Sequence, residues 1–306
     1  MNRPARAPRR RVDGILLLDK PAGITSNAAL QRARRVLQAE KAGHTGTLDP
    51  LASGLLPLCF GDATKFAQQL LDARKEYLAT VRLGRSTTTG DAEGETVAEA
   101  PVSCSRDDLL GVLPRFLGRI LQTPPRYAAL KRDGRAWYEY ARAGVEIERE
   151  PRPVDIDALE LVDYAAPVAT LRVACGKGTY VRALAEDIGA ALGVPAHLGA
   201  LRRTVAGPFA LATAVGLDVL EAGGTAAAAE RLLPIDAALG VLPRLELGPD
   251  AVAALRQGRR LPAGDLAAGS YRGYVAGDRF AGVVVATDGE LRPGRMARPL
   301  VCPAAG

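Results

Sequence analysis

The stretch GHTGTLDPLASGLLPLCFG, from Gly43 to Gly61, joins a polar, glycine-punctuated turn to an apolar strand over residues 55–60. Such a turn can hold a reactive group at the edge of a scaffold, because the strand anchors it while its polar side chains stay outside the core. The candidate reactive group is Asp49. An aspartate before proline is also common turn chemistry, since the aspartate bonds its own backbone and Pro50 fixes the next φ. The stretch alone therefore leaves both interpretations of Asp49 open.

The flanking sequence predicts an α+β fold with a mixed or antiparallel central sheet and helices packed on it. Apolar runs and polar–apolar alternation predict strands, whereas apolar residues three and four positions apart predict helices. The predicted strands cover residues 14–19, 55–60, 75–84, 118–123, 154–164, 168–175 and 198–209. The predicted helices cover residues 26–39 (capped by Ser26 or Asn27), 62–73 (capped by Asp62, with Leu71 buried), 105–117, 180–192 and much of 213–239.

Two further segments lack these helix patterns. Residues 85–95 predict a long polar loop with no core of its own. From Leu245 onward, short alternating segments split by Gly and Pro predict a small all-β unit of about 60 residues, a size at which an independent core is marginal.

The composition is that of an ordinary globular protein of 306 residues, with 48% hydrophobic and 24% charged residues. No run approaches the roughly 18 consecutive apolar residues of a membrane helix. The four cysteines show no CxxC spacing, and the chain has only two histidines, His44 and His197, so no zinc site is expected and the cysteines are interpreted as reduced cytosolic thiols. A net charge of +6 permits a nucleic-acid partner without requiring one.

Residues 126–152 differ in composition from the rest. They combine seven Arg or Lys residues with Tyr127, Trp137, Tyr138 and Tyr140 around a predicted helix that Gly144 ends. Basic residues interleaved with aromatic ones suit phosphate neutralisation and base stacking. An amphipathic hairpin that packs its aromatics explains the segment equally well.

The segment after residue 175 contains a failed motif and an unusual arginine. Gly176 to Thr179 ends like a phosphate-binding loop, but the upstream glycine is missing and the lysine is followed by glycine. Arg182 falls in the first turn of the following helix, where a cation is unfavourable with the helix dipole. We therefore expect Arg182 to have a partner elsewhere in the fold.

Taken together, several blocks resemble the bacterial TruB-type tRNA pseudouridine synthases, in order from about residue 13 to 240. They are GILLLDKPAGITSN, KAGHTGTLDPLASGLLPLCFGDATKF, KEYLATVRLG, TTTGDAEG and GKGTYVRALAEDIG. The last 60 residues resemble the small PUA-like β-barrel of that family. The basic composition of residues 1–12 predicts a flexible tail. The resemblance implies a catalytic domain at 13–240 with an RNA-binding insertion at 126–152, and a PUA-like domain at 245–306.

The resemblance implies isomerisation of uridine to pseudouridine at position 55 in the T-loop of tRNA, by base flipping. This reaction breaks the glycosidic bond and re-forms a carbon–carbon bond to the same sugar, so it needs no cofactor and no metal. Asp49 matches the catalytic aspartate of the family, and Arg182 matches the arginine that pairs with it. A carboxylate suits a sugar that develops positive charge, either as a nucleophile or by acting on a sugar proton.

The remaining matches concern the substrate. Tyr77 matches the tyrosine that stacks on the target base, and Tyr180 and Leu201 match residues that line the base pocket. His44 and Lys20 match positions that contact the RNA or support the site, and Asp91 matches the region near the extruded nucleotide. The resemblance further implies tRNA as the partner, in a cytoplasmic protein expected to be a monomer.

Two other functions are compatible with parts of the sequence. A non-catalytic RNA-binding or RNA-folding module would share the basic surface and the terminal barrel. A glycosidase acting on small nucleosides would share the carboxylate but would not need the basic surface. The pair Asp49 and Arg182 separates these alternatives, because a pure binder has no use for a desolvated carboxylate that faces a phosphate-rich ligand.

Overall fold

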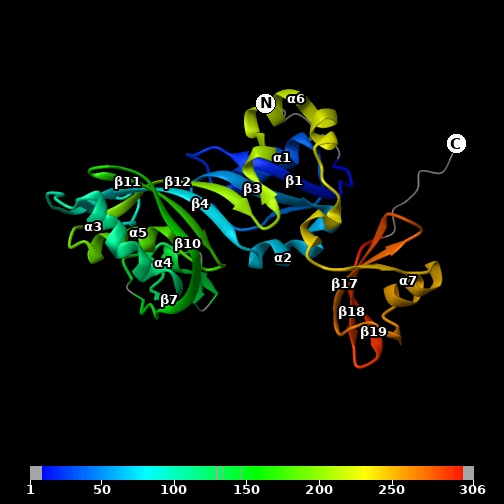
Figure 1. Ribbon diagram of the computed structural model, residues 1–306. Coiled ribbons are helices and arrows are strands. Elements are labelled where there is room, and N and C mark those ends of the chain that lie inside the picture. Colours follow the sequence, from blue (N-terminus) through cyan, green and yellow to red (C-terminus); the bar gives the residue numbers. More distant parts are fainter. Residues whose placement is uncertain (1–8, 129, 133, 146, 299–306) are drawn as a thin grey trace.

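The computed structural model describes residues 9–128, 130–132, 134–145 and 147–298. Within these residues the chain forms one large sheet flanked by helices and a smaller C-terminal sheet with its own helix, as Figure 1 shows. The predicted α+β class is confirmed. We call the first part the large-sheet unit and the part from β15 onward the C-terminal unit.

The large sheet holds ten strands of the described chain, in the order β14–β1–β3–β12–β4–β11–β10–β7, with β2 beside β3 and β13 beside β12. Most neighbours are antiparallel, but β14 runs parallel to β1 and β12 runs parallel to β3, so the sheet is mixed, as predicted. The strands are β1 (Gly14–Lys20), β2 (Ala42–His44), β3 (Ser53–Phe60), β4 (Lys75–Leu83), β7 (Gly118–Gln122), β10 (Arg152–Ala165), β11 (Val168–Cys175), β12 (Ala196–Ala206), β13 (Phe209–Ala210) and β14 (Val215–Gly216).

Several helices pack against this sheet, and two of them begin with a side-chain cap, at Thr25 and Ser105. The helices of the large-sheet unit are α1 (Ser26–Val36), α2 (Ala67–Asp72), α3 (Arg106–Val112), α4 (Trp137–Arg142), α5 (Val181–Ala191) and α6 (Leu217–Glu230), with 3-10 turns η1 (Gly61–Phe66), η2 (Leu113–Phe116), η3 (Leu211–Thr213) and η4 (Ile235–Leu239). The cap of α1 is Thr25, which accepts from the Ala28 amide, and not Ser26 or Asn27 as predicted. Ser26 does not cap the helix, because its hydroxyl is hydrogen-bonded to the backbone of Leu48.

The predicted helix at 62–73 is wrong in its first half. Residues 61–66 form the 3-10 turn η1, and Asp62 does not cap it. Asp62 instead accepts hydrogen bonds from Lys65 Nζ at 3.2 Å and from the Arg298 amide at 2.5 Å, so it is used to hold the C-terminal end of the described chain. Leu71, predicted to be buried, is exposed because α2 is a short helix that shows one side to solvent.

The residues at 85–95 are more ordered than predicted. Strand β5 (Arg85–Thr87) pairs with β6 (Thr96–Glu99), so the segment is a hairpin. Asp91 at its tip is buried and forms an isolated bridge with Leu198 of β12. The hairpin could not be predicted from the polar composition of the segment, because its tip is held by hydrogen bonds rather than by apolar contacts.

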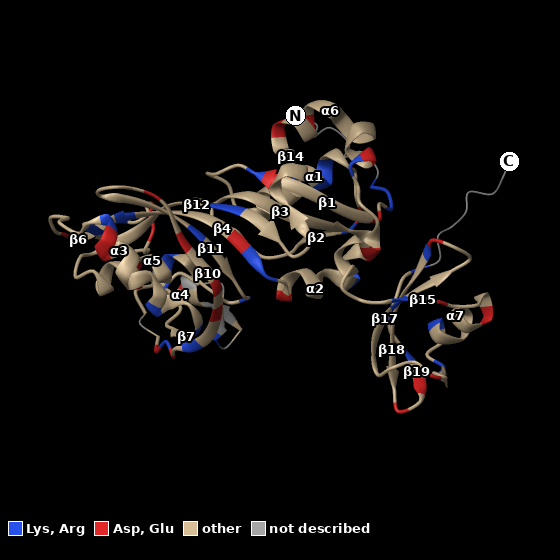
Figure 2. Cartoon of the chain, in the orientation of Figure 1, with Lys and Arg blue, Asp and Glu red and all other residues tan. Residues whose placement is uncertain are grey.

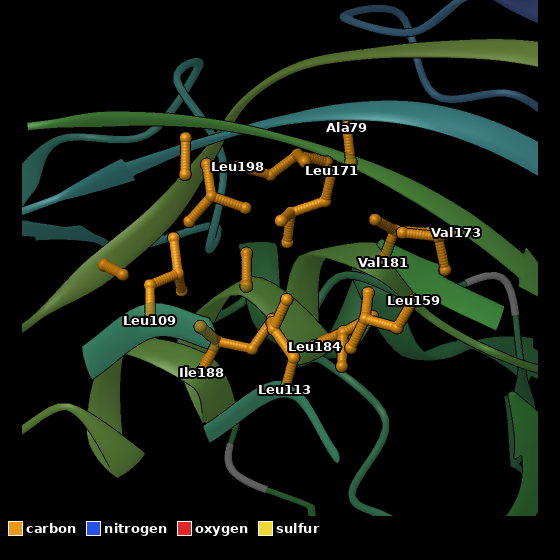
Figure 3. Close-up of a cluster of buried hydrophobic side chains, with 14 of the residues drawn as sticks. Ala79, Leu109, Leu113, Leu159, Leu171, Val173, Val181, Leu184, Ile188 and Leu198 are labelled. Atoms are coloured by element: carbon orange, nitrogen blue, oxygen red, sulfur yellow. The ribbon is translucent and has the colours of Figure 1, made fainter. Parts of the chain in front are cut away.

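Three apolar cores of the described chain pack on the large sheet, and two of them share partners at its middle. One packs α3 and α5 against β4, β11 and β12, and Figure 3 shows Leu184 and Ile188 of α5 meeting Leu171 and Leu198 of the sheet. The other packs α1 and α6 against β1 and β3. Tyr77 and Leu201 contact both cores, so they mark the junction between the two halves of the sheet.

The prediction that the C-terminal unit is all-β is wrong, because the unit contains a helix. Its five strands follow the order β15–β17–β18–β19–β16, and helix α7 (Pro249–Arg256) packs on them through Val252 and Leu255. Proline at the first turn of a helix and apolar residues three apart explain this helix. The strands are β15 (Arg244–Glu246), β16 (Leu261–Pro262), β17 (Gly269–Val275), β18 (Arg279–Thr287) and β19 (Glu290–Met296).

The two units are in contact. The rings of Phe66 and Phe280 meet edge to face with centroids 5.3 Å apart, and Lys65 Nζ donates to the Met296 carbonyl at 3.1 Å. These contacts lie at η1, which explains why that segment is a tight turn that faces the smaller sheet.

Part of the predicted N-terminal tail is attached to the large-sheet unit. The Arg10 amide donates to the Gln38 carbonyl at 2.7 Å, and Val12 joins the core beneath α1. Residues 1–8 of the predicted tail, and 299–306 at the other end, lie outside the described residues. In the described part of the chain, none of the helices is both long and apolar enough to cross a membrane.

Candidate active site

The loop that carries Asp49 is fixed to the sheet and to the start of α1. The Ser26 hydroxyl bonds both the amide and the carbonyl of Leu48, at 2.8 and 2.9 Å. On the other side, the Gly23 amide donates to the Pro50 carbonyl at 2.8 Å. Residues 48 and 50 are therefore both held by the turn after β1, and the backbone of Asp49 has little freedom between them.

Arg182 meets Asp49 across the junction of the two cores. Its Nη2 lies 3.0 Å from Asp49 Oδ2, and its Nη1 lies 3.7 Å from Asp91 Oδ2. The arginine side chain is only 7% exposed, whereas that of Asp49 is 43% exposed. The unfavourable position of Arg182 at the start of α5 is thus offset by two carboxylates, and the more accessible of them is Asp49.

Backbone carbonyls complete the setting of Arg182. Nη1 donates to Thr89 at 3.2 Å and Nη2 donates to Tyr127 at 2.9 Å. Asp91 is itself tied down, since Oδ1 accepts from the Thr89 hydroxyl at 2.5 Å and from the Glu93 amide at 3.1 Å. The guanidinium therefore cannot turn away from Asp49 without losing several charge-assisted hydrogen bonds.

Opposing effects act on the pKa of the Asp49 carboxyl group. Burial by the surrounding protein raises the pKa of Asp49, even though one side of the carboxyl is open, while the positive charges of Arg182 and Lys20 lower it and Asp91 raises it further. Lys20 is fully buried and donates to the carbonyls of Pro21 and Ile24. Burial lowers the pKa of Lys20 to about 8, a change that the negative charge of Asp49 opposes. The two cations favour the ionised carboxylate in a site that would otherwise favour its neutral form.

The predicted base-binding residues lie around this pair. Tyr77 on β4 and Leu201 on β12 sit at the junction of the cores, in strands that pair with each other. Tyr180 precedes α5 directly, and its amide and carbonyl are both bonded to the side chain of Gln122, at 2.8 and 3.2 Å. The turn that Gln122 fixes thus positions both Tyr180 and Arg182, which follows two residues later.

His44 lies on β2 opposite Leu58. Burial, followed by the charge of Arg203, lowers the pKa of His44, so the neutral imidazole is favoured. Its Nδ1 is buried and has no hydrogen-bond partner among the described residues. A neutral ring that does not bond the carboxylate fits a supporting position better than that of a general base.

Three residues of this region were not singled out from the sequence. Gln122 fixes Tyr180, and Glu93 has a pKa raised by burial and then by the negative charges of Asp91 and Asp49. Arg203 is buried and donates to two backbone carbonyls of the stretch Gly43–Gly61. A basic residue inside an apolar strand was the available signal for Arg203. The partner of Gln122 lies 58 residues away and leaves no local pattern.

The arrangement offers a partly exposed carboxyl group, a buried cation paired with it, and an aromatic ring at the junction of the cores. A carboxyl group in such a setting can act on an electron-poor carbon or on a proton. No group of three or more His, Cys, Asp or Glu side chains that could hold a metal ion occurs in the described ranges.

Comparison with known proteins gives three family matches that follow one another along the chain. The N-terminal domain of the TruB family pseudouridylate synthases matches residues 34–181. The tRNA pseudouridylate synthase B C-terminal domain matches residues 182–240, and the pseudouridine synthase II TruB C-terminal domain matches residues 243–297. The matches cross both units.

Individual proteins agree with this. The chain is 58% identical over 289 residues to tRNA pseudouridine synthase B of Azoarcus sp. (strain BH72), covering 94% of this chain and 96% of that protein. It is 55% identical over 298 residues to the protein of the same name from Burkholderia mallei (strain ATCC 23344), covering 95% and 96%. A chain from a structure of an H/ACA ribonucleoprotein bound to a substrate RNA containing 2′-deoxyuridine superposes with a TM-score of 0.70 at 27% identity, covering 94% of this chain and 85% of that chain. The predicted fold class, with its PUA-like C-terminal unit, is confirmed.

Proposed function

The chain belongs to the TruB family of pseudouridylate synthases, and from this premise we propose how its own residues convert uridine to pseudouridine at position 55 in the T-loop of tRNA. The reaction is an isomerisation of a uridine in tRNA. The single observation that carries the assignment of roles is the ion pair of Asp49 with the buried Arg182.

The chemistry balances without any co-reactant. The bond from uracil N1 to the sugar breaks, the base rotates, and its C5 bonds the same sugar carbon. The proton on C5 leaves and N1 ends with a proton, so the formula of the nucleotide is unchanged. Asp49 meets the positive charge that develops on the sugar, by bonding the sugar carbon or by removing a sugar proton, and either course begins with the ionised carboxylate.

The other residues of the site supply charge and shape. Arg182 favours the ionised form of Asp49 and fixes the orientation of its carboxylate, while Asp91 forms a second ion pair with the guanidinium. Lys20 adds a second cation, and His44 supports the loop from β2. The residues proposed to contact the base are Tyr77 for stacking and Tyr180 and Leu201 for the walls of the pocket, since an extruded base needs an aromatic face and an apolar enclosure.

RNA binding and the division into domains form the rest of the proposal. We assign catalysis to residues 13–240, closure over the T arm to the insertion at 126–152, and a PUA-like domain to 245–306. The exposed Arg126 and Arg132 support the assignment of the insertion. The protein acts as a monomer in the cytoplasm under this proposal; sedimentation of the free protein and of its tRNA complex would test the oligomeric state.

The decisive experiment is Asp49→Asn. Incubated with unmodified tRNA transcript, the variant is expected to form no pseudouridine, measured by chemical adduct formation, while its affinity for tRNA stays within about threefold, because amide and carboxylate have the same shape but only the carboxylate is a nucleophile or base. The matched control is Asp157→Asn, which removes another arginine-paired carboxylate, 3.2 Å from Arg74.

The outcomes separate the candidate functions. Activity of Asp49→Asn would overturn the assignment of the catalytic residue. A wild-type protein that binds tRNA and forms no product would instead favour the RNA-binding module. Product at a uridine other than position 55 would leave the chemistry standing and overturn the proposed target.

A further inference from the structure

Arg203 occupies an unusual position beneath the catalytic loop. Its side chain comes from β12 and the residue is 1% exposed. Its Nε donates to the Leu55 carbonyl at 2.7 Å and its Nη2 donates to the Gly46 carbonyl at 3.1 Å. One guanidinium thus joins the loop that leads to Asp49 with the strand that leaves it.

This buried cation has no carboxylate within ion-pair distance in the described part of the chain. The contrast is its neighbour Arg202, half-exposed, which pairs with Asp19 at 2.7 Å. Burying a charge without an opposite charge costs several kcal/mol, so chains rarely keep one where a neutral residue would serve. The cost indicates that the charge or the donors of Arg203 are used.

Tyr77 is the group on which that charge acts. Arg203 and Tyr77 lie opposite each other in the paired strands β12 and β4. Burial raises the pKa of the Tyr77 hydroxyl, the positive charge of Arg203 lowers it, and the negative charge of Asp49 raises it. The hydroxyl therefore lies within the electrostatic reach of both Arg203 and Asp49.

The position of this charge has a chemical consequence. Residues directly opposite each other in an antiparallel pair project from the same face of the sheet, so the guanidinium lies on the Tyr77 side of β4. A nearby positive charge favours the orientation of a hydroxyl in which the oxygen faces the charge and the proton points away. Because the same guanidinium holds the Gly46 carbonyl, this orientation is set relative to the loop that carries Asp49.

We propose that Arg203 is a positioning residue for pseudouridine formation, which fixes the loop at Gly46 and directs the hydroxyl proton of Tyr77 toward the reacting uridine. The proposal rests on the proposed function and deepens it. It assigns to Arg203 no contact with the RNA, because the side chain is enclosed by protein.

The test is a set of single-turnover rates at saturating enzyme, with tRNA affinity and melting temperature measured in parallel. Arg203→Met is expected to slow pseudouridine formation by about 10- to 100-fold with affinity within about threefold, since charge-assisted hydrogen bonds are lost behind the site and not on its surface. Arg203→Lys keeps the charge but cannot present a planar fork to the carbonyls of Leu55 and Gly46, so it is expected to stay slow. Recovery of the full rate by Arg203→Lys would overturn the proposal.

A matched control separates positioning from stability. Lys75 is also a buried cation, with Nζ 2.6 Å from the carbonyls of Leu71 and Ala73. Lys75→Met keeps the aliphatic length and removes the same kind of interaction at the end of α2. It is expected to melt at a lower temperature, as Arg203→Met does, yet to react within about threefold of wild type. Equal losses of rate in the two variants would show that Arg203 acts only through stability and would overturn the proposal.

The link to Tyr77 is tested by a double-mutant cycle. If Arg203 acts through the hydroxyl, Arg203→Met should slow the Tyr77→Phe enzyme at least about fivefold less than it slows wild type, because interacting residues are not additive. Full additivity would overturn the link. Asp49→Asn is measured beside these variants, so that failure of the proposed function shows as an inactive wild type, whereas failure of this inference shows as an active enzyme indifferent to Arg203.

Discussion

The catalytic loop and the insertion at 126–152 are held in opposite ways. The loop from Gly43 to Asp49 is bonded to α1, to β3 and to Arg203, all parts of the large-sheet unit. The insertion carries a two-stranded sheet of its own, β8 (Lys131–Arg132) with β9 (Arg135–Ala136), and the short helix α4. The proposed reactive group is thus placed on the large-sheet unit, while the segment proposed to bind RNA carries a small sheet and a helix of its own.

Arg182 joins the two regions through a single nitrogen. Its Nη2 lies 3.0 Å from Asp49 Oδ2 and 2.9 Å from the Tyr127 carbonyl of the insertion. A displacement of the insertion therefore changes the surroundings of the catalytic carboxylate. Figure 2 shows Lys and Arg spread over both the large-sheet unit and the C-terminal unit.

Two glycines give the strongest test of this contrast. Gly54 in β3 and Gly134 in the insertion both have positive φ, at +99° and +78°. A Cβ on Gly54 would lie 2.3 Å from the Arg203 carbonyl oxygen, whereas a Cβ on Gly134 meets nothing within 4 Å. Gly54→Ala is expected to destabilise the protein by more than about 4 kcal/mol, since backbone must move, and Gly134→Ala by only about 1 kcal/mol, the cost of the left-handed conformation alone.

The measurement is chemical denaturation of the two variants and wild type. We expect a large fall of the midpoint for Gly54→Ala and a small one for Gly134→Ala. Similar falls for both would contradict the view that the scaffold is rigid at β3 and open at the insertion.

Local signals mark Asp49 and Arg182 as candidates. Asp49 is one because a polar turn and an apolar strand are adjacent, although the family resemblance was needed to choose between a turn residue and a reactive group. Arg182 is one because it opposes the dipole of its own helix. Arg203 could not be assigned in this way, because its partners Leu55 and Gly46 lie 148 and 157 residues away and are backbone carbonyls. Every residue has a backbone carbonyl, so the residue types in the sequence do not show which carbonyls accept from Arg203.

The same distinction holds for the fold. Strands with clear alternation, such as β4 and β11, were predicted closely, because burial of one face sets the pattern. Asp62 was misjudged as a helix cap since its partner, the amide of Arg298, belongs to the other unit. The helix α7 was missed because two apolar residues, Val252 and Leu255, are too few to reveal its period among Gly- and Pro-rich segments.

Arg182→Met tests the link between the regions and has the next largest expected effect. Removing the cation loses a preorganised charge next to the carboxylate, so the single-turnover rate is expected to fall by about 10²- to 10³-fold. The pKa of Asp49 is already raised by burial, and Arg182 opposes that rise. Without Arg182 the pKa rises further, less of the carboxylate is ionised at a given pH, and the acid limb of the rate profile moves toward higher pH.

The pH profile of single-turnover rates checks this, with Arg172→Met as control. Arg172 pairs with Glu76 at 2.6 Å on the same sheet, away from Asp49. Its loss is expected to leave both the rate and the acid limb in place. An unmoved acid limb in Arg182→Met would mean that another group sets the ionisation of the carboxylate.

Removal of two exposed arginines from the insertion should have the smallest effect on the rate and act on binding instead. The double variant Arg126→Ala with Arg132→Ala is expected to weaken tRNA binding about tenfold and to reduce the slope of log affinity against log salt by about 0.7–0.9 for each phosphate that is no longer neutralised. The rate at saturation should stay within about threefold, because neither change touches the hydrogen bonds that hold Arg182. The control pair, Arg106→Ala with Arg115→Ala, removes two exposed arginines outside the insertion and should leave the slope unchanged. An unchanged slope in the variant with Arg126→Ala and Arg132→Ala would contradict RNA binding by the insertion and favour the alternative of a packing hairpin. Its hydrogen bond with Arg182 would then be its main contribution to the site.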